Sequence, residues 1–224
     1  MERPYKIAVL GGTGAQGSGL ALRLAAAGHE LAIGSRDAAR AALAASQFSA
    51  RAGKTIVGSD NRAAAAAAEI AILTVPYAVQ RATIEHVLDH LHGKVLVDST
   101  VPLVPPKVGV VQLPDGQSAV AAIQRLAGDR VRVVSAFQNV SAQHLAELDH
   151  KIDCDVLVCG DDRAACDIVI ALCADMGMRG LHAGPLANSA AAEALTSVLI
   201  TINRRYKVAG AGIRITGLPG SAAG

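Results

Sequence analysis

Three glycines near the start of the chain have the spacing of a phosphate-binding turn. Gly12, Gly14 and Gly17 form the pattern G-x-G-x-x-G between an apolar run and a helical pattern. The first glycine allows a tight turn, the second lets the backbone approach a pyrophosphate, and the third lets the helix pack against the strand. Unpaired N–H groups at the helix start then attract phosphate. We therefore expect a dinucleotide-binding turn made of Gly12, Thr13, Gly14, Ala15, Gln16 and Gly17.

The second apolar run ends in residues that favour a phosphorylated ribose. An NAD site carries Asp or Glu near this position, where the carboxylate binds the ribose hydroxyls. This chain has Ser35 and Arg36 there, and a guanidinium can bind a 2′-phosphate with paired hydrogen bonds. The next residue, Asp37, is suited to capping the following helix. The pattern predicts NADP rather than NAD, with a solvated surface charge at Arg36 as the alternative.

A later apolar run, Ile70–Val75, leads directly into Pro76. In a doubly wound sheet, ligands bind outside the carboxyl ends of the strands. We therefore expect Thr74, Val75 and Pro76 to flank a nicotinamide ring, unless the segment is only a strand-to-helix turn.

The sequence has no convincing set of acid–base catalytic residues. His86 and His90 have the i, i+4 spacing that can bind a metal, but a solvated helix face is the simpler interpretation. The four cysteines lie between residues 154 and 173 without a C-x-x-C pair, so we expect free thiols and no metal site. A protein without acid–base machinery is suited to direct hydride transfer between two molecules that it binds and orients.

Short apolar runs alternate with longer, alanine-rich helical stretches, which predicts βαβ units and a mainly parallel sheet. The expected strands are Lys6–Leu10, Glu30–Gly34, Thr55–Val57, Ile70–Val75, Val95–Asp98, Val131–Ala136, Asp155–Cys159 and Gly180–His182. The expected helices are Gln16–Ala27, Ala38–Ala52, Arg62–Ala67, Ala78–His90, Ser118–Leu126, Ala164–Asp175 and Ala187–Ala209. The segment Thr100–Gln117 is rich in Pro and Gly and long for a loop, which suggests either a functional role or mobility.

The composition excludes several classes of protein. With 51% hydrophobic and 18% charged residues, the 224-residue chain can bury a sizeable core and is not disordered. A net charge of +2 and an aromatic content of 2% argue against nucleic-acid binding. No apolar run approaches the ~20 residues of a membrane span, and a strand pattern begins too early for a signal peptide. We therefore expect a cytoplasmic protein.

Short stretches typical of one known family are spread along most of the chain, to about residue 216. They are Gly11–Gly14, Leu20–Leu24 with Gly28-His29, Gly34–Arg36, Thr74–Pro76, Val134–Ala136, Asp155–Asp162, Ala183–Ser189 and Glu193–Thr196. In this combination the chain resembles the F420-dependent NADP reductases (NADPH:F420 oxidoreductases). The first stretch alone would fit many dinucleotide-binding proteins, and the later ones make the resemblance specific.

The resemblance implies a Rossmann-type doubly wound α/β fold with a small helical C-terminal part. Residues 1–135 would form the NADP-binding domain, and residues 136–224 would complete the sheet and the substrate cleft. It also implies a homodimer and hydride exchange between NADP and the deazaflavin coenzyme F420. By position, Thr13, Ser35 and Arg36 would hold the 2′-phosphate, and Ala136 would join Thr74–Pro76 beside the nicotinamide. The second substrate would meet Gln138, Asn139, Val140 and Thr196.

The chain departs from the family pattern in this second pocket. Gln138 occupies a position where the family frequently has His. Ala190 occupies a position where family members can have Arg, and Ala194 occupies one where a small hydroxyl residue can occur. These residues offer an anionic deazaflavin fewer donors and less positive charge. Two alternatives therefore remain open. One is an NADP-dependent oxidoreductase with another acceptor, namely a flavin, a pterin, or a small carbonyl or imine. The other is a non-catalytic NADP-binding protein.

The expected helix Ala187–Ala209 is apolar over more than one stripe. Its apolar residues include Ala191, Leu195, Val198, Leu199 and Ile202, and such a broad face needs more cover than one sheet provides. We expect this helix to close the second cleft and to supply a dimer surface.

Overall fold

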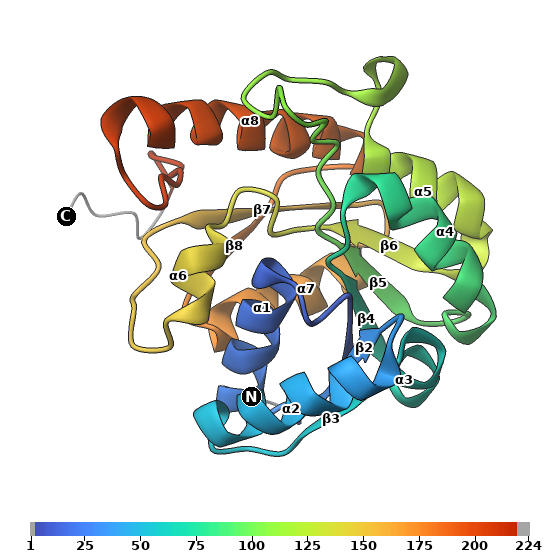
Figure 1. Cartoon of the computed structure of the whole chain (residues 1–224). Helices are drawn as coiled ribbons and strands as arrows, with labels where there is room; N and C mark the ends of the chain where they lie inside the picture. Colours follow the sequence, from blue (N-terminus) through green and yellow to red (C-terminus); the bar gives the residue numbers. More distant parts are fainter. Residues whose placement is uncertain (1–2, 219–224) are drawn as a thin grey trace.

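A computed structural model of the chain describes residues 3–218 and is built on one eight-stranded sheet (Figure 1). The strand order is β3-β2-β1-β4-β5-β6-β7-β8. The strands are β1 Lys6–Leu10, β2 Glu30–Ser35, β3 Ile56–Asp60, β4 Ile70–Leu73, β5 Val95–Asp98, β6 Arg132–Ser135, β7 Asp155–Gly160 and β8 Arg179–His182. Strands β1 to β6 are parallel, β7 runs antiparallel to β6, and β8 is parallel to β7.

Helices cover both faces of the sheet, which makes the central strands buried on both sides. The helices are α1 Ala15–Ala26, α2 Ala38–Ala52, α3 Asn61–Ala67, α4 Tyr77–Val87, α5 Ala119–Ala127, α6 Ala142–Ala146, α7 Arg163–Asp175 and α8 Ser189–Tyr206. One core cluster lies under α1, α2, α6 and α7, and a second lies under α3, α4 and α5. Strands β4 and β5 are buried along their whole length, as their continuous apolar runs predict. The Rossmann-type, mainly parallel sheet expected from the sequence is confirmed.

Side-chain caps define where most of these helices begin. Asp37 accepts a hydrogen bond from the N–H of Arg40 at the start of α2, which confirms the capping role predicted for it. Asp60, Ser118, Ser141 and Asp162 cap α3, α5, α6 and α7 in the same way. Helix α1 differs, because Gly14 precedes it and no side chain caps its first turn.

Several predicted boundaries were wrong. Strand β3 continues past Val57 to Asp60, because pairing with β2 carries its polar end along the sheet. The fourth strand ends at Leu73, two residues before the predicted Val75. The last helix ends at Tyr206 rather than Ala209, since Lys207 adopts the left-handed conformation of a C-cap. The short helix α6 was missed, because five residues are too few to show helical periodicity.

Helix α8 lies across the carboxyl ends of the strands, with the segment 99–117 beside it (Figure 1). The hydroxyls of Ser197 and Thr201 donate to the carbonyls of Val110 and Gly109 at 3.3 and 3.0 Å. Among the described residues, no helix is long and apolar enough to cross a lipid bilayer. Strand β6 ends at Ser135, and β7 then runs antiparallel to it; the division into two domains at residue 135 stays a prediction.

Candidate functional site

The glycine turn is tied to the end of the neighbouring strand by its backbone. The N–H groups of Gly11 and Gly12 donate to the carbonyl of Gly34 at 3.0 and 3.1 Å. Gly11 has φ +76°, which an L side chain rarely adopts, and a Cβ on Gly12 would lie 2.8 Å from the Cβ of Ile33. The sequence pattern included Gly12 but missed the conformational requirement at Gly11. These contacts bring the turn and the end of β2 side by side.

The first turn of α1 is shaped to receive an anion. Gly14 is extended and exposed, Ala15 is exposed, and the N-cap offers no side-chain acceptor to the first N–H groups. Gly17 lies so close to β4 that a Cβ there would be 2.5 Å from Thr74 Oγ1. Unsatisfied N–H groups and the helix dipole both favour a phosphate at this position. The free N–H groups at this end of the helix can therefore donate hydrogen bonds to a pyrophosphate.

The end of β2 leaves a guanidinium available beside this turn. Ser35 is buried, and its hydroxyl accepts from the N–H of Asp37 at 3.3 Å. Arg36 is exposed, and no hydrogen bond or ion pair within residues 3–218 engages it. A solvated, unpaired guanidinium is free to bind a phosphate monoester in bidentate fashion.

A cavity of about 370 Å³ adjoins Arg36 and is walled by one stripe of α4. Its lining residues are Ser35, Arg36, Asp60, Asn61, Val79, Ala82, Thr83 and His86. The N–H of Ala63 donates to Asp60 and, as the main cause, lowers the pKa of that carboxyl. The Oδ1 atom of Asn61 is buried and has no hydrogen-bond partner in the described part of the chain. The cavity therefore offers an apolar wall and several polar groups, as an adenosine would require.

The ends of β4 and β5 place polar groups at the middle of the cleft. The hydroxyl of Thr74 donates to the carbonyl of Leu10 at 3.0 Å, and Pro76 precedes the first residue of α4. Asp98 is wholly buried and accepts from Gln80 Nε2 at 2.6 Å and from the N–H of Thr100 at 2.9 Å. Burial raises the pKa of Asp98.

The turn after β6 contains an unusual backbone conformation. Phe137 is fully buried and has φ +73°, a strained value for a bulky residue. Gln16 Nε2 donates to the Phe137 carbonyl at 2.8 Å, and this bond links α1 to the turn. Gln16, predicted as a phosphate-turn residue, therefore also holds the opposite wall of the cleft. Ala136, predicted to line the nicotinamide, is fully buried.

The four residues predicted to meet the second substrate lie together. Gln138, Asn139, Val140 and Thr196 all line one cavity of about 280 Å³ between the turn and α8. The Thr196 hydroxyl donates to the carbonyl of Gln138, and Gln138 Nε2 donates to the carbonyl of Asp98, each at 2.8 Å. The amide oxygens of Gln138 and Asn139 are buried without partners in the described part of the chain.

A buried carboxylate that sequence reasoning missed joins α8 to α5. Glu193 is 1% exposed and accepts from the Ser118 hydroxyl at 2.5 Å and from the N–H groups of Ala119 and Val120 at 2.8 and 3.2 Å. Burial raises the pKa of Glu193 despite these hydrogen bonds. The signal was present, because Glu193 is the single charged residue between Ser189 and Asn203.

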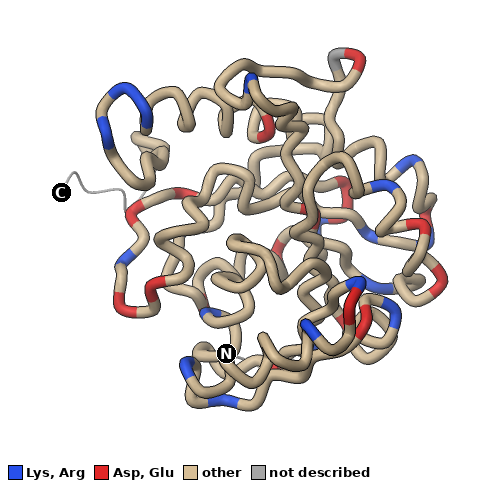
Figure 2. Tube along the Cα trace, viewed as in Figure 1, with Lys and Arg blue, Asp and Glu red and all other residues tan. Residues whose placement is uncertain are grey.

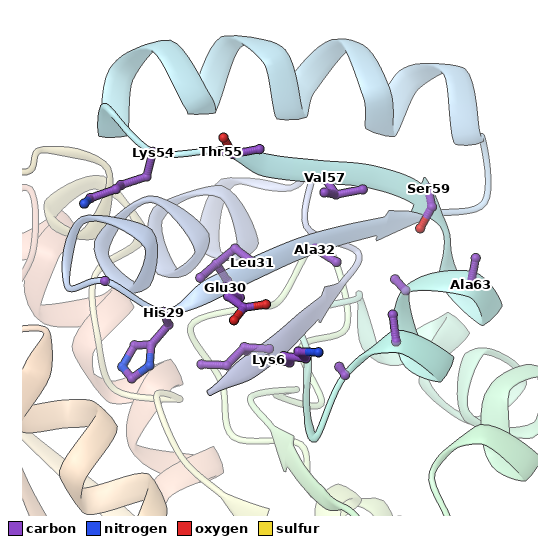
Figure 3. A pocket seen from close by; sticks show the side chains of 15 residues that line it. Lys6, His29, Glu30, Leu31, Ala32, Lys54, Thr55, Val57, Ser59 and Ala63 are labelled. Atoms are coloured by element: carbon purple, nitrogen blue, oxygen red, sulfur yellow. The ribbon is translucent and has the colours of Figure 1, made fainter. Parts of the chain in front are cut away.

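A large hollow of about 670 Å³ lies away from these groups (Figure 3). It follows the open face of β1, β2 and β3, where the seven-residue α3 leaves the sheet bare, and Lys6, Glu30 and Val57 line it. Lys6 and Glu30 begin their strands, whereas the glycine turn and Arg36 follow the ends of the same strands. The candidate site is therefore the cleft at the carboxyl ends, as expected for a doubly wound sheet.

The remaining candidate residues, the four cysteines and His90, lie outside the cavities described above for the cofactor and the second substrate. Cys154, Cys159, Cys166 and Cys173 are buried and unpaired, and burial raises the pKa of all four thiols. His90 lies in a short 3₁₀ turn, Leu88–His90, after α4 and does not line the cavity that His86 lines.

Comparisons with known proteins identify a family to which the chain is similar. Residues 6–102 match the model of a family described as coenzyme F420-dependent NADP oxidoreductase. The chain is 44% identical over 222 residues to an F420-dependent NADP reductase of Methanothermobacter marburgensis, covering 96% of this chain and 99% of the relative. It is 41% identical to the enzyme of that name from Methanocaldococcus jannaschii, covering 95% and 99% of the two chains.

Solved structures extend the likeness to the fold. A protein from an Arthrobacter species, named as a candidate F420-dependent NADP reductase, superposes with a TM-score of 0.81 at 28% identity and covers 95% of this chain and 100% of its own. An imine reductase from Bacillus cereus shares the fold, with a TM-score of 0.60 at 19% identity over 90% of this chain and 62% of its own.

Proposed function

Because the chain belongs to the family of F420-dependent NADP reductases, we propose that it transfers a hydride between NADP(H) and coenzyme F420. The observation that carries the proposal is the near-complete match with those reductases, which includes both the glycine turn and the region of α8. A match limited to residues 6–102 would support only dinucleotide binding.

The chain's own residues fit the NADP end of this reaction. The uncapped start of α1 would bind the pyrophosphate, and Thr13, Ser35 and the unpaired Arg36 would bind the 2′-phosphate. Thr74, Val75, Pro76 and Ala136 would hold the nicotinamide beside the carboxyl ends of the strands. When bound, the two coenzymes supply the hydride chemistry, and the protein contributes orientation and the exclusion of water.

The second cavity fits the edge of a flat heterocycle. Val140 and Leu199 provide apolar walls, and Thr196 lies on the α8 side. The unpartnered amide oxygens of Gln138 and Asn139 can accept hydrogen bonds, and the deazaflavin ring carries an imide N–H that can donate one. Gln138 cannot carry a positive charge, so we expect an anionic deazaflavin to bind less tightly than it would with His at this position.

A homodimer formed through α8 is part of the same proposal. Val198 is 46% exposed on α8, and Val110 and Val111 are exposed on the adjacent segment 99–117. Figure 2 shows α8 uncharged along most of its length, with basic residues gathered near its end. A symmetric contact between two copies would cover this apolar strip. Four unpaired cysteines also suit the reducing cytoplasm, where we expect the protein to act.

The direct test is a turnover assay with NADPH and F420, in which the loss of absorbance of oxidised F420 measures the rate. We expect at least ~1 turnover per second, near the lower end for enzymes. Gln138→His and Ala190→Arg should strengthen F420 binding without changing the affinity for NADPH. If the wild type is inactive and neither substitution creates activity, the F420 proposal fails. A parallel panel of flavin, pterin and imine acceptors then identifies the partner.

A further inference from the structure

We infer that Glu193 is a positioning residue for the second substrate, because it fixes α8 on the start of α5 and thereby holds Thr196 at the cavity beside the turn after β6. The inference rests on the proposed hydride transfer to F420 and adds to it a buried side chain that does not line the cavity itself. It gives a reason for a buried carboxyl in a helix that is otherwise uncharged as far as Asn203.

The contact between Glu193 and α5 is made by three hydrogen bonds. The Ser118 hydroxyl and the N–H groups of Ala119 and Val120 donate to the carboxyl at 2.5, 2.8 and 3.2 Å. The two N–H groups belong to the first turn of α5, where a helix has no acceptor of its own for them. The Ser118 hydroxyl also caps α5 by accepting from the N–H of Ala121 at 2.9 Å. The carboxyl therefore ties α8 to α5 at one buried point.

Thr196 transmits this contact to the cavity. It lies three residues beyond Glu193, so the two side chains are neighbours along α8. Its hydroxyl donates to the carbonyl of Gln138 at 2.8 Å, and both residues line the cavity of about 280 Å³. A helix transmits displacement as a rigid element, so a shift of α8 at the first contact also moves the second.

Further hydrogen bonds connect the cavity wall back to α5. Gln138 Nε2 donates to the carbonyl of Asp98 at 2.8 Å. Gln80 Nε2 donates to the Asp98 carboxyl at 2.6 Å and to the carbonyl of Ala119 at 3.5 Å. The network thus runs from α5 through α8, the turn after β6 and β5, and returns to α5 through α4. Its members support one another, so the position of α8 depends on each of them.

The other polar contacts of α8 serve different segments. Ser197 and Thr201 donate to carbonyls of the loop after β5, and that loop does not line the cavity. Ser189 contacts the hydroxyl that caps α5 through a single hydrogen bond at the very start of α8. Glu193 makes three hydrogen bonds to α5 and lies next to Thr196, so it has the larger influence on the cavity.

The NADP end of the cleft should not depend on this contact. No hydrogen bond within residues 3–218 joins α8 to the glycine turn or to Arg36. Loss of the Glu193 contact should therefore weaken the binding of the second substrate and leave the binding of NADPH nearly unchanged.

The test is steady-state kinetics with NADPH and F420, in which KM is measured for each substrate at saturation of the other. The variants are Glu193→Ala, which removes all three hydrogen bonds, and Glu193→Gln. Gln keeps the size of the side chain and one oxygen acceptor, but it turns an amide NH₂ group toward an N–H donor of α5. The Gln variant therefore tests the contact with the least disturbance of the fold.

We expect KM for F420 to rise about threefold in Glu193→Gln and about tenfold in Glu193→Ala, with a change in KM for NADPH of less than about twofold. The control is Val169→Ala, which removes two methyl groups from the core under α7. This control should lower the stability and leave both KM values unchanged, which separates a general loss of stability from the effect on the cavity.

A double-mutant cycle shows whether Glu193 acts through Thr196. Thr196→Val keeps the shape of the side chain and removes the hydroxyl that bonds to Gln138. In this background, Glu193→Gln should raise KM for F420 by less than about twofold. Fully additive effects, or an unchanged KM for F420 in both Glu193 variants, would overturn the inference and leave the proposed function intact. A wild type that does not reduce F420 would contradict the proposed function, and the inference with it.

Discussion

The turn at residues 11–14 is held by backbone hydrogen bonds between neighbouring strands, whereas the turn at residues 137–140 is held by side chains from distant elements. The first turn uses the backbone carbonyls of Val9, Gly11 and Gly34 as acceptors, and it needs room for close backbone contact. The second depends on Gln16 from α1, Thr196 from α8, and the amides of Gln138 and Asn139, which bond to carbonyls of β5 and β7.

This difference shows how related chains can keep the same dinucleotide-binding turn while the residues that meet the second substrate change. A backbone-built phosphate site tolerates change elsewhere, since few side chains participate. A turn built from side chains responds to substitutions in several elements at once. Of the three departures from the family pattern, Gln138 lies in the second turn, whereas Ala190 and Ala194 lie in α8 and do not line the cavity beside that turn.

The largest effect should come from cutting the connection between α1, which follows the first turn, and residues 144–150, which follow the second turn. Arg23 of α1 is 8% exposed and donates to the carbonyls of His144, Leu145, Glu147 and His150 at 2.5–3.0 Å. Arg23→Ala should lower the free energy of unfolding by ~3 kcal/mol, because several carbonyls lose a charged donor. Chemical denaturation measures this loss. Arg40→Ala, on the exposed side of α2, should change the stability by less than ~0.5 kcal/mol. Equal losses in the two variants would contradict the proposed connection.

The next largest effect is confined to the phosphate region. Arg36→Ala should weaken NADPH binding by roughly tenfold or more, since a charged hydrogen bond contributes ~1.5–3 kcal/mol. The affinity for NADH should hardly change, because that cofactor lacks the 2′-phosphate. Fluorescence titration with both cofactors checks the prediction. Equal affinity of the wild type for NADPH and NADH would refute it.

A smaller effect should show which of the two turns depends on Gln16, a residue that contacts the second turn from the start of α1. Gln16→Ala removes the hydrogen bond to the Phe137 carbonyl and releases a strained turn. We expect KM for F420 to rise about threefold to tenfold, as for the loss of one neutral hydrogen bond, with little change in KM for NADPH. Gln47→Ala, exposed on α2, is the matched control. If KM for NADPH rises instead, Gln16 acts in the phosphate turn alone.

The smallest effect should be a change in the pH dependence of stability. Burial raises the pKa of Asp98 in the folded state, so the folded protein retains a proton that the unfolded chain releases near pH ~4. This contribution to stability is complete below pH ~4 and is lost as the pH rises through the folded pKa. Asp98→Asn should therefore gain stability relative to the wild type as the pH increases. Thermal unfolding at several pH values measures that difference, and a pH-independent difference would argue against the raised pKa.

Much of the phosphate region could be predicted from local sequence. A backbone geometry that involves few distant residues can be predicted from two local patterns. These are the spacing of Gly12, Gly14 and Gly17, and the Ser35-Arg36 pair after an apolar strand. The apolar runs predicted the strands, although the polar end of β3 and the short α6 escaped because neither has hydrophobic periodicity.

Only the tertiary structure decided which distant groups meet. It joined Glu193 to the start of α5, Arg23 to the α6 segment, and His86 to the compartment of Arg36. No periodicity encodes such pairs, because each depends on how helices cross the sheet after the chain has folded. The sequence by itself determined a dinucleotide-binding α/β fold, because local backbone requirements specify that turn. Packing between elements determined the second cavity and the buried carboxylates, because desolvation and hydrogen bonding arise only once those elements are in contact.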